Sequence, residues 1–164
     1  MLHILQQPSE STVANRYLIP APELVVSSHV MTGESTFVVC VTLSYHGEGE
    51  EVIDKSIDGK QDVLQGIKRV TVDTDNRVAF TKLKVMDVSS KHRHQPFCLV
   101  FTLEEYHVDG RKEIHSTMRT SPFQVQSRPN KRKALPGEQP APKRFANSLD
   151  ITRTSSMPNV PTLR

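Results

Sequence analysis

The sequence predicts an all-β fold, an antiparallel β-sandwich followed by a disordered basic tail. Three observations lead to this prediction. From about Glu23 the apolar residues recur at every second position, which is typical of strands and not of helices. Glycine, proline and acidic turn signals separate these short stretches, as in sandwich folds. After Gln126 the alternation stops, and Pro, Ser, Asn and basic residues replace it.

The first clear strand is TFVVCVTLSYH, residues 36–46, and HGEGEE follows it as a turn. One face of this strand carries apolar and aromatic residues, namely Phe37, Val39, Val41, Leu43 and Tyr45. RVTVDTDNRVAFTKLKV, residues 69–85, then predicts two strands that a polar turn at 73–76 joins into a hairpin. QDVLQGIKR, residues 61–69, lies between the strand at 36–46 and the stretch at 69–85. It is compatible with a short helix or with the start of a strand.

The stretch PFCLVFTLEEY, residues 96–106, repeats the strand pattern. Its apolar face consists of Phe97, Leu99, Phe101 and Leu103. VDGRK supplies a turn with an Asp-Gly pair, and residues 113–128 close the domain with one or two strands. We therefore expect one domain at 16–128. Residues 1–15 and 129–164 are expected to be disordered, because they lack the apolar surface that offsets the entropy of ordering.

Composition limits the class of protein. A chain of 164 residues with 36% hydrophobic content holds one ordinary domain and a tail. Its two cysteines, Cys40 and Cys98, form no disulfide framework and favour a reduced intracellular setting. The N-terminus lacks a basic region, and the longest apolar runs, FVVCV and FCLVF, fall far short of a membrane span. We expect neither a signal peptide nor a membrane partner.

Charge divides unevenly along the chain. Residues 1–126 carry 13 Lys and Arg against 16 Asp and Glu, whereas residues 127–164 carry 8 against 2. The net positive charge therefore belongs to the tail. Any attraction of the domain for a polyanion must come from a local patch.

The familiar enzyme motifs GxSxG and HExxH and the phosphate-binding glycine loops are absent from the sequence, so we expect no catalytic site and no cofactor. Cys98 lies near His94, but a thiol within FCLVF is expected to be buried as a small hydrophobe. His92, His94 and Cys98 offer three ligands for zinc, whereas a structural zinc site needs four. A solvated loop is the simpler interpretation of this spacing.

The densest charge of the predicted domain is in SSKHRHQPF, where Lys91, His92, Arg93 and His94 directly precede the strand at 96–106. Two interpretations compete for this loop. It is either a solvated turn that only connects strands or a loop that touches an acidic partner.

The tail contains two basic clusters, Lys131-Arg132-Lys133 and Lys143-Arg144, separated by nine residues rich in Pro, Gly and Gln. Two such clusters on a flexible spacer are typical of a bipartite nuclear localisation signal, which an import receptor binds in acidic pockets. They predict a nuclear protein. A solvated linker that only keeps the chain soluble is the alternative.

A second tail feature surrounds Ser156, which follows Arg153 by three residues and precedes Met157-Pro158. This spacing suits a basophilic kinase, and the phosphorylated segment would resemble a ligand of 14-3-3-type readers. An unused Ser/Thr stretch is the alternative.

Two segments resemble a known family. The run VAFTKLKVMDVSSKHRHQPFCLVFTL, residues 78–103, and the close SPFQVQSRPNKRK, residues 121–133, resemble immunoglobulin-fold transcription factors of the Rel, STAT and Runt type. They look most like the CudA-type, STAT-related factors. The resemblance covers roughly residues 20–133.

The resemblance implies an immunoglobulin-like sandwich whose loops at one end contact double-stranded DNA, with a homodimer as one possible assembly. The expected DNA contacts are Lys91, His92, Arg93, His94, Arg128 and Lys131. It thus predicts a sequence-specific DNA-binding transcription regulator. The alternative is a β-sandwich interaction or scaffold module that the basic tail localises to the nucleus.

Overall fold

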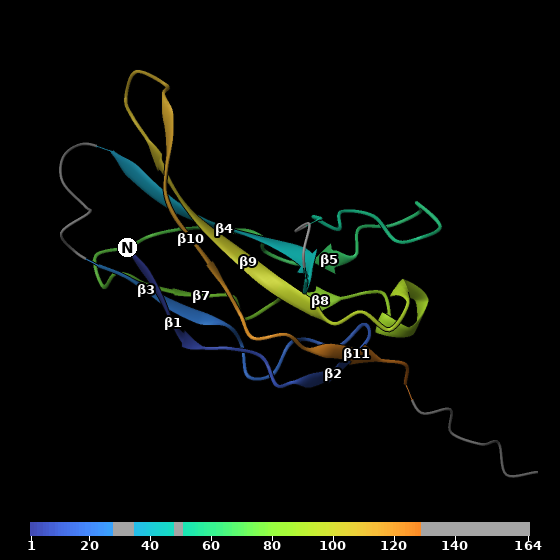
Figure 1. Ribbon diagram of the computed structural model, residues 1–164. Helices are drawn as coiled ribbons and strands as arrows, with labels where there is room; N and C mark the ends of the chain where they lie inside the picture. The colour runs from blue at the N-terminus through green and yellow to red at the C-terminus, as the bar shows by residue number, and fades with distance from the viewer. Residues whose placement is uncertain (28–34, 48–50, 129–164) are drawn as a thin grey trace, which may run out of the picture. The chain divides into compact units, whose positions relative to one another are not determined.

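The structure is a computed structural model, and it describes residues 1–27, 35–47 and 51–128. In these ranges the regular elements are strands and one 3-10 helix, so the all-β prediction is confirmed (Figure 1). None of the described segments forms a helix with the length and apolar content needed to cross a membrane.

The larger sheet has four antiparallel strands in the order β10-β9-β4-β6. These strands are β4 (Thr36–Tyr45), β6 (Arg69–Thr71), β9 (Phe97–Tyr106) and β10 (Lys112–Arg119). The predicted strands at 36–46 and 96–106 are thus confirmed, and they pair with each other along their whole length. The Asp-Gly turn joins β9 to β10 as expected, with the His107 amide donating to the Arg111 carbonyl at 3.0 Å.

A second sheet has three antiparallel strands in the order β1-β3-β7: β1 (Leu2–Gln6), β3 (Glu23–Val26) and β7 (Arg77–Ala79). Two smaller pairs complete the fold. Of these, β2 (Ser11–Val13) pairs in parallel with β11 (Gln124–Gln126), and β5 (Leu64–Gln65) pairs antiparallel with β8 (Lys84–Val85).

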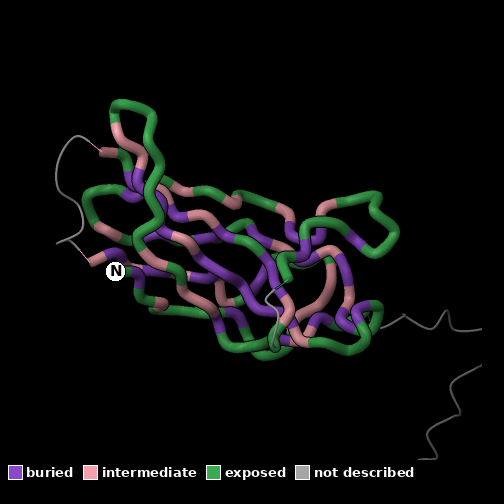
Figure 2. The backbone as a smooth tube through the Cα atoms, turned by 45° about the horizontal axis from the view of Figure 1, so that its top comes forward, coloured by how far each residue is buried: buried purple, intermediate pink, exposed green. Residues whose placement is uncertain are grey.

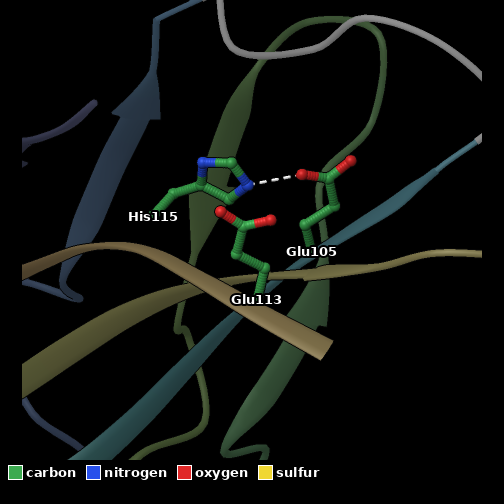
Figure 3. Close-up of side chains that lie close together, drawn as sticks. All are labelled: Glu105, Glu113 and His115. Atoms are coloured by element: carbon green, nitrogen blue, oxygen red, sulfur yellow. Dashed lines mark hydrogen bonds and ion pairs between the residues drawn. The ribbon is translucent and has the colours of Figure 1, made fainter. Parts of the chain in front are cut away.

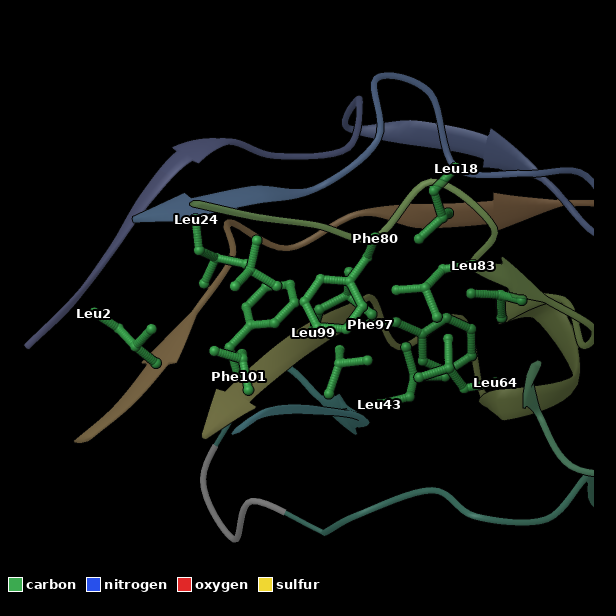
Figure 4. Packing of buried hydrophobic residues seen from close by; sticks show 14 of the residues in the cluster. Leu2, Leu18, Leu24, Leu43, Leu64, Phe80, Leu83, Phe97, Leu99 and Phe101 are labelled. Carbon is green, nitrogen blue, oxygen red and sulfur yellow. The ribbon is translucent and has the colours of Figure 1, made fainter. Parts of the chain in front are cut away.

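The core draws side chains from both sheets (Figure 4). The predicted apolar face of β9 is confirmed, since Phe97, Leu99, Phe101 and Leu103 are all 0% exposed. Residues of β1, β3 and β7 belong to the same cluster, namely Leu2, Leu24, Val26 and Val78. Burying each such side chain contributes about 1.5–3 kcal/mol. Buried positions lie on the strands and also on connecting segments, as at Leu18, Phe80 and Leu83, whereas residues 108–111 of the β9–β10 turn are exposed (Figure 2).

The N-terminal segment corrects one prediction. Residues 1–15 were expected to be disordered, but they contain β1 and β2. Leu2 is fully buried, and β1 pairs with β3 in the register Leu2↔Val26 to Gln6↔Glu23. A short alternating stretch such as MLHIL is ordered here because β3 supplies both its hydrogen bonds and its apolar neighbours.

The segment 69–85 corrects a second prediction. Its polar turn forms as expected, with the Asn76 amide donating to the Asp73 carbonyl at 2.9 Å. However, β6 pairs with β4 in one sheet, and β7 pairs with β3 in the other. The segment therefore crosses between sheets and is no hairpin. Period-two alternation shows which face of a strand is buried but not which strand it pairs with.

Candidate functional site

The basic loop predicted from the sequence lies between β8 and β9. It contains the 3-10 helix η2 (Ser89–His92), after which Arg93 and His94 adopt left-handed φ values of 55° and 61°. Two adjacent non-glycine residues in this region are uncommon and cost on the order of 1–3 kcal/mol each. Hydrogen bonds hold the strained turn, including that from the His94 amide to the Ser89 carbonyl at 2.9 Å. The loop thus has a defined shape as it enters β9.

His92 belongs to the interior and not to the exposed surface of the loop. Its side chain is 1% exposed, and its ring lies edge-on to Phe97 with centroids 5.1 Å apart. Both ring nitrogens have partners, since Nδ1 is 2.6 Å from the Tyr45 hydroxyl and Nε2 is 3.2 Å from Asp87 Oδ2. The expectation that His92 donates to DNA is corrected, because a ring enclosed in this way offers no donor to the solvent.

Lys91 is also tied to this buried network. Its ammonium lies 3.1 Å from Oδ1 of Asp87, whose side chain is 2% exposed, although the lysine side chain itself is 64% exposed. Burial raises the pKa of Asp87, but hydrogen bonds from Lys91, the Val88 amide and His92 outweigh it and hold the pKa below its usual range. Part of the Lys91 charge is therefore neutralised within the fold.

β11, the last strand, contacts this loop. The Val125 amide in β11 donates to Ser89 Oγ at 2.9 Å, and Gln124 Nε2 donates to the His94 carbonyl at 3.2 Å. These contacts join segments that are some thirty residues apart in sequence. β11 and Ser127 after it therefore lie beside His94.

Arg128 follows β11 and is anchored on Asn15. Its Nη2 donates to the Asn15 carbonyl at 3.3 Å, while Lys84 Nζ donates to Asn15 Oδ1 at 3.3 Å. Arg16 directly follows Asn15 in the chain. Neither Arg93, Arg128 nor Arg16 forms an ion pair with another residue of the described ranges. These exposed cations, together with Lys84 and His94, are called the basic end below.

A shallow hollow of about 340 Å³ lies between the loop and β11. It is lined by hydroxyl, amide and imidazole side chains around one valine: Ser89, Ser90, His94, Gln124, Val125, Gln126 and Ser127. None of these lining residues is acidic. A hollow on the other side of the loop, about 290 Å³, is lined by Lys91 and Arg93 together with Glu51. The first hollow thus offers hydroxyl, amide and imidazole donors without a carboxylate, whereas the second combines two cations with one carboxylate.

The other sequence-predicted residues divide into two groups. Lys131, Arg132, Lys133, Lys143, Arg144 and Ser156 lie outside the described residues. Cys98 is buried as expected, and its Sγ lies 3.7 Å from the carbonyls of Ser44 and Tyr45. Since His92 contacts Tyr45 and Asp87 instead, the spacing His92-His94-Cys98 does not create a common ligand set.

Sequence reasoning missed three residues of the basic end: Asn15, Arg16 and Lys84. Lys84 was placed in a hairpin, and the other two were assigned to or next to a disordered segment. The signal available in the sequence was weak. Asn15 has a φ of 58°, and asparagine is one of the few residues that adopt this conformation readily, so it marked a turn.

The sequence matches the family model of the DG1062 N-terminal domain over residues 23–161, and the chain belongs to this family. A comparison with curated proteins finds no match. The name of the family states no ligand, reaction or partner.

Proposed function

We propose that this chain is a sequence-specific DNA-binding module of a nuclear transcription regulator, and that its role is binding and not catalysis. The observation that carries the proposal is the convergence at the basic end. His94 from the loop and Ser127, next to Arg128 at the chain exit, line a hollow whose lining contains no acidic side chain. Arg93, adjacent to His94, lines the hollow on the other side of the loop. Cations that form no ion pair within the described ranges, beside hydroxyl and amide donors, suit the phosphates of a duplex.

The proposed architecture is an immunoglobulin-like β-sandwich of the Rel, STAT and Runt type, closest to the CudA-type factors. Two features support it. The antiparallel β4–β9 pair forms the centre of a sheet whose apolar face shares one core with β1, β3 and β7. The strained loop before β9 is hydrogen-bonded to β11, which supports the proposal that this loop and the chain exit contact DNA together.

The contacts at the basic end suggest separate roles for its residues. Arg93 is presented by a backbone turn that hydrogen bonds fix, so its guanidinium starts from a limited range of positions. Arg128 is oriented by its hydrogen bond to Asn15. We propose that both contact phosphates and that the following basic tail, beginning with Lys131, extends the contact along the DNA. Base recognition would fall to residues such as His94 and Gln124 beside the hollow.

Salt-dependent DNA binding tests the proposal. The affinity of the full chain for a short random-sequence duplex is measured by fluorescence anisotropy between about 50 mM and about 200 mM salt. The wild type should bind with a steep fall in affinity. Replacing both arginines, Arg93→Ala with Arg128→Ala, should reduce the slope of log affinity against log salt by about 2, since each phosphate contact contributes about 0.9.

The matched control replaces two exposed arginines elsewhere, Arg77→Ala with Arg111→Ala, which changes the net charge equally. An equal loss of slope in the control would show that only overall charge matters. Binding without salt dependence, or no binding, would favour the scaffold function instead.

Nuclear localisation is proposed from the tail. Replacing Lys131, Arg132 and Lys133 with alanine should move a fusion too large for passive diffusion out of the nucleus, with a weaker effect for Lys143 and Arg144. The position of the fusion in cells is read by fluorescence microscopy. If the variant with all five substitutions stays nuclear, the tail is not the import signal.

A further inference from the structure

The far end of β9 carries a cluster of side chains that the proposed DNA contact does not use. Glu105 and His107 come from the end of β9 and the turn after it, and Glu113 and His115 come from β10. Glu105 and Glu113 are directly opposed in the β9–β10 register. The register shifts between Ile114 and Ser116, so His115 lies at a bulge that aims its ring towards Glu105 (Figure 3).

The potential ligand atoms lie close together. His115 Nε2 is hydrogen-bonded to Glu105 Oε2, and one ligand atom each of Glu105, Glu113 and His115 lies within 4.8 Å of the others. His107 adds contacts of 3.6 Å, from Nδ1 to Glu105 Oε1 and from Nε2 to Glu113 Oε2. Four ligands at about 2.0–2.2 Å in a tetrahedron would stand roughly 3.3–3.6 Å apart. Glu105, Glu113 and His115 already approach this spacing, whereas the His107 ring must turn to offer one nitrogen to the same centre, because its two contacts use different nitrogens.

Glu105 occupies a position where the sheet pattern calls for an apolar residue. It continues the inward row of Phe97, Leu99, Phe101 and Leu103. Its register partner on the neighbouring strand β4 is Phe37. The residue is 7% exposed, and the His115 ring lies 5.7 Å from the Phe37 ring. A carboxylate held in such a place requires a compensating positive charge. A second carboxylate directly opposite it increases that requirement.

Glu104, the residue before Glu105, lies on the other face of the same strand, and basic side chains compensate its charge. Glu104 forms ion pairs with Lys112 at 2.7 Å and Arg69 at 3.2 Å. In the described part of the chain, by contrast, the ion-pair partners of Glu105 and Glu113 are imidazoles alone. Imidazole nitrogen beside carboxylate oxygen is the ligand combination that zinc accepts.

We propose that Glu105, Glu113, His115 and His107 form a binding site for a divalent transition metal, with Zn²⁺ as the ion that suits the ligands. Its ligands would come from both sides of the hairpin, so that the ion ties β9 to β10 where their ladder is irregular. It also supplies the positive charge that the opposed carboxylates lack. This site lies apart from the basic end and does not depend on DNA binding.

Titration of the full metal-free chain with zinc chloride at neutral pH, followed by calorimetry, tests the site. The wild type should bind one equivalent that Glu113→Gln and His115→Gln each weaken by at least about tenfold, since loss of even an outer partner of a metal ligand costs about 10–100-fold in affinity. Both side chains are at least partly exposed, at 64% and 26%, so these changes should leave the fold intact in far-UV circular dichroism. Glu105 is left unchanged because its burial makes a folding defect more severe.

Matched controls separate this site from other zinc ligands in the chain. Asp109→Asn removes a carboxylate of the same hairpin, and His94→Gln removes an imidazole of the basic end. Neither should weaken the binding. The visible absorption of bound Co²⁺ supplies a second measurement, since a site with four ligands gives intense bands that His115→Gln should abolish. No stoichiometric binding by the wild type, or equal binding by the two ligand variants and the controls, would overturn the proposal and leave these histidines as ion-pair partners of the carboxylates.

Discussion

The two ends of β9 use the same residue types for different purposes. At its start, His92 is enclosed by Tyr45, Asp87 and Phe97, while the cations beside it face outward. At its end, two partly exposed histidines lie among carboxylates. The apolar row along the strand supports both arrangements. The comparison shows that the partners of a histidine, and not its neighbours in sequence, decide whether it is structural or available to a ligand.

The same comparison bears on the proposal that a domain with an excess of acidic residues binds DNA. Its 16 Asp and Glu outnumber 13 Lys and Arg over residues 1–126. Several of the carboxylates gather around the β9–β10 hairpin, including Glu104, Glu105, Asp109 and Glu113. The arginines that form no ion pair within the described part of the chain, Arg16, Arg93 and Arg128, belong to the basic end. Segregation of this kind orients a polyanion towards one end of the domain.

The largest expected effect distinguishes the two histidines of the loop. His92→Ala should lower the free energy of unfolding by about 2–4 kcal/mol, because it leaves a cavity beside Phe97 and removes partners from Tyr45 and Asp87. His94→Ala, on the exposed side, should change it by less than about 0.5 kcal/mol. Urea denaturation followed by circular dichroism measures both. Equal effects would contradict the structural role of His92.

A smaller change in stability is expected for Glu104, which lies on the outer face at the far end of β9. Burial raises the pKa of Glu104, but hydrogen bonds from Lys112, Tyr106 and Cys40 and the charge of Lys112 lower it to about 2. Glu104→Ala should therefore lower the free energy of unfolding by about 1–2 kcal/mol, because the hydrogen bonds and ion pairs of the carboxylate are lost. The loss is not larger, because the basic partners remain solvated without the carboxylate. The urea midpoint reports this change. A midpoint equal to that of the wild type would show that the cluster contributes nothing.

The third prediction concerns pH at the start of β9. The pKa of Asp87 is lowered in the folded state, so its contribution is present above the unfolded value of about 3.9 and is lost as pH falls through the folded value. Asp87→Asn should be less stable than the wild type by about 1 kcal/mol at neutral pH. The gap should narrow below about pH 4, as followed by urea denaturation at several pH values. A gap that stays constant would show that the charge of Asp87 is irrelevant.

Much of the strand pattern was predictable from local sequence. The alternation in 36–46 and 96–106 identified the buried faces correctly, because a residue's side of the sheet follows from its parity. Pairing partners were not predictable in the same way. The crossing of 69–85 between sheets and the pairing of β1 with β3 depend on residues far away in the chain.

The charge of the basic loop predicted its position in the sequence, but not that His92 is buried while His94 is exposed. Nothing in the run KHRH distinguishes His92 from His94, since burial of His92 depends on Tyr45 from β4, some forty-seven positions away. At the other end of β9, a signal was present and was missed. Glu105 falls on the apolar parity of its strand, and an acidic residue at such a position indicates a charged partner inside the sheet.

The most direct test of the comparison between the ends of β9 is a residue-resolved titration. Amide chemical shifts of the ¹⁵N-labelled full chain are recorded as duplex DNA is added. Residues 89–94 and 124–128 should shift, and residues 104–115 should stay unchanged, because DNA phosphates are attracted to the basic end and repelled by the acidic hairpin. Shifts confined to residues 129–164, or centred on the hairpin, would contradict the account.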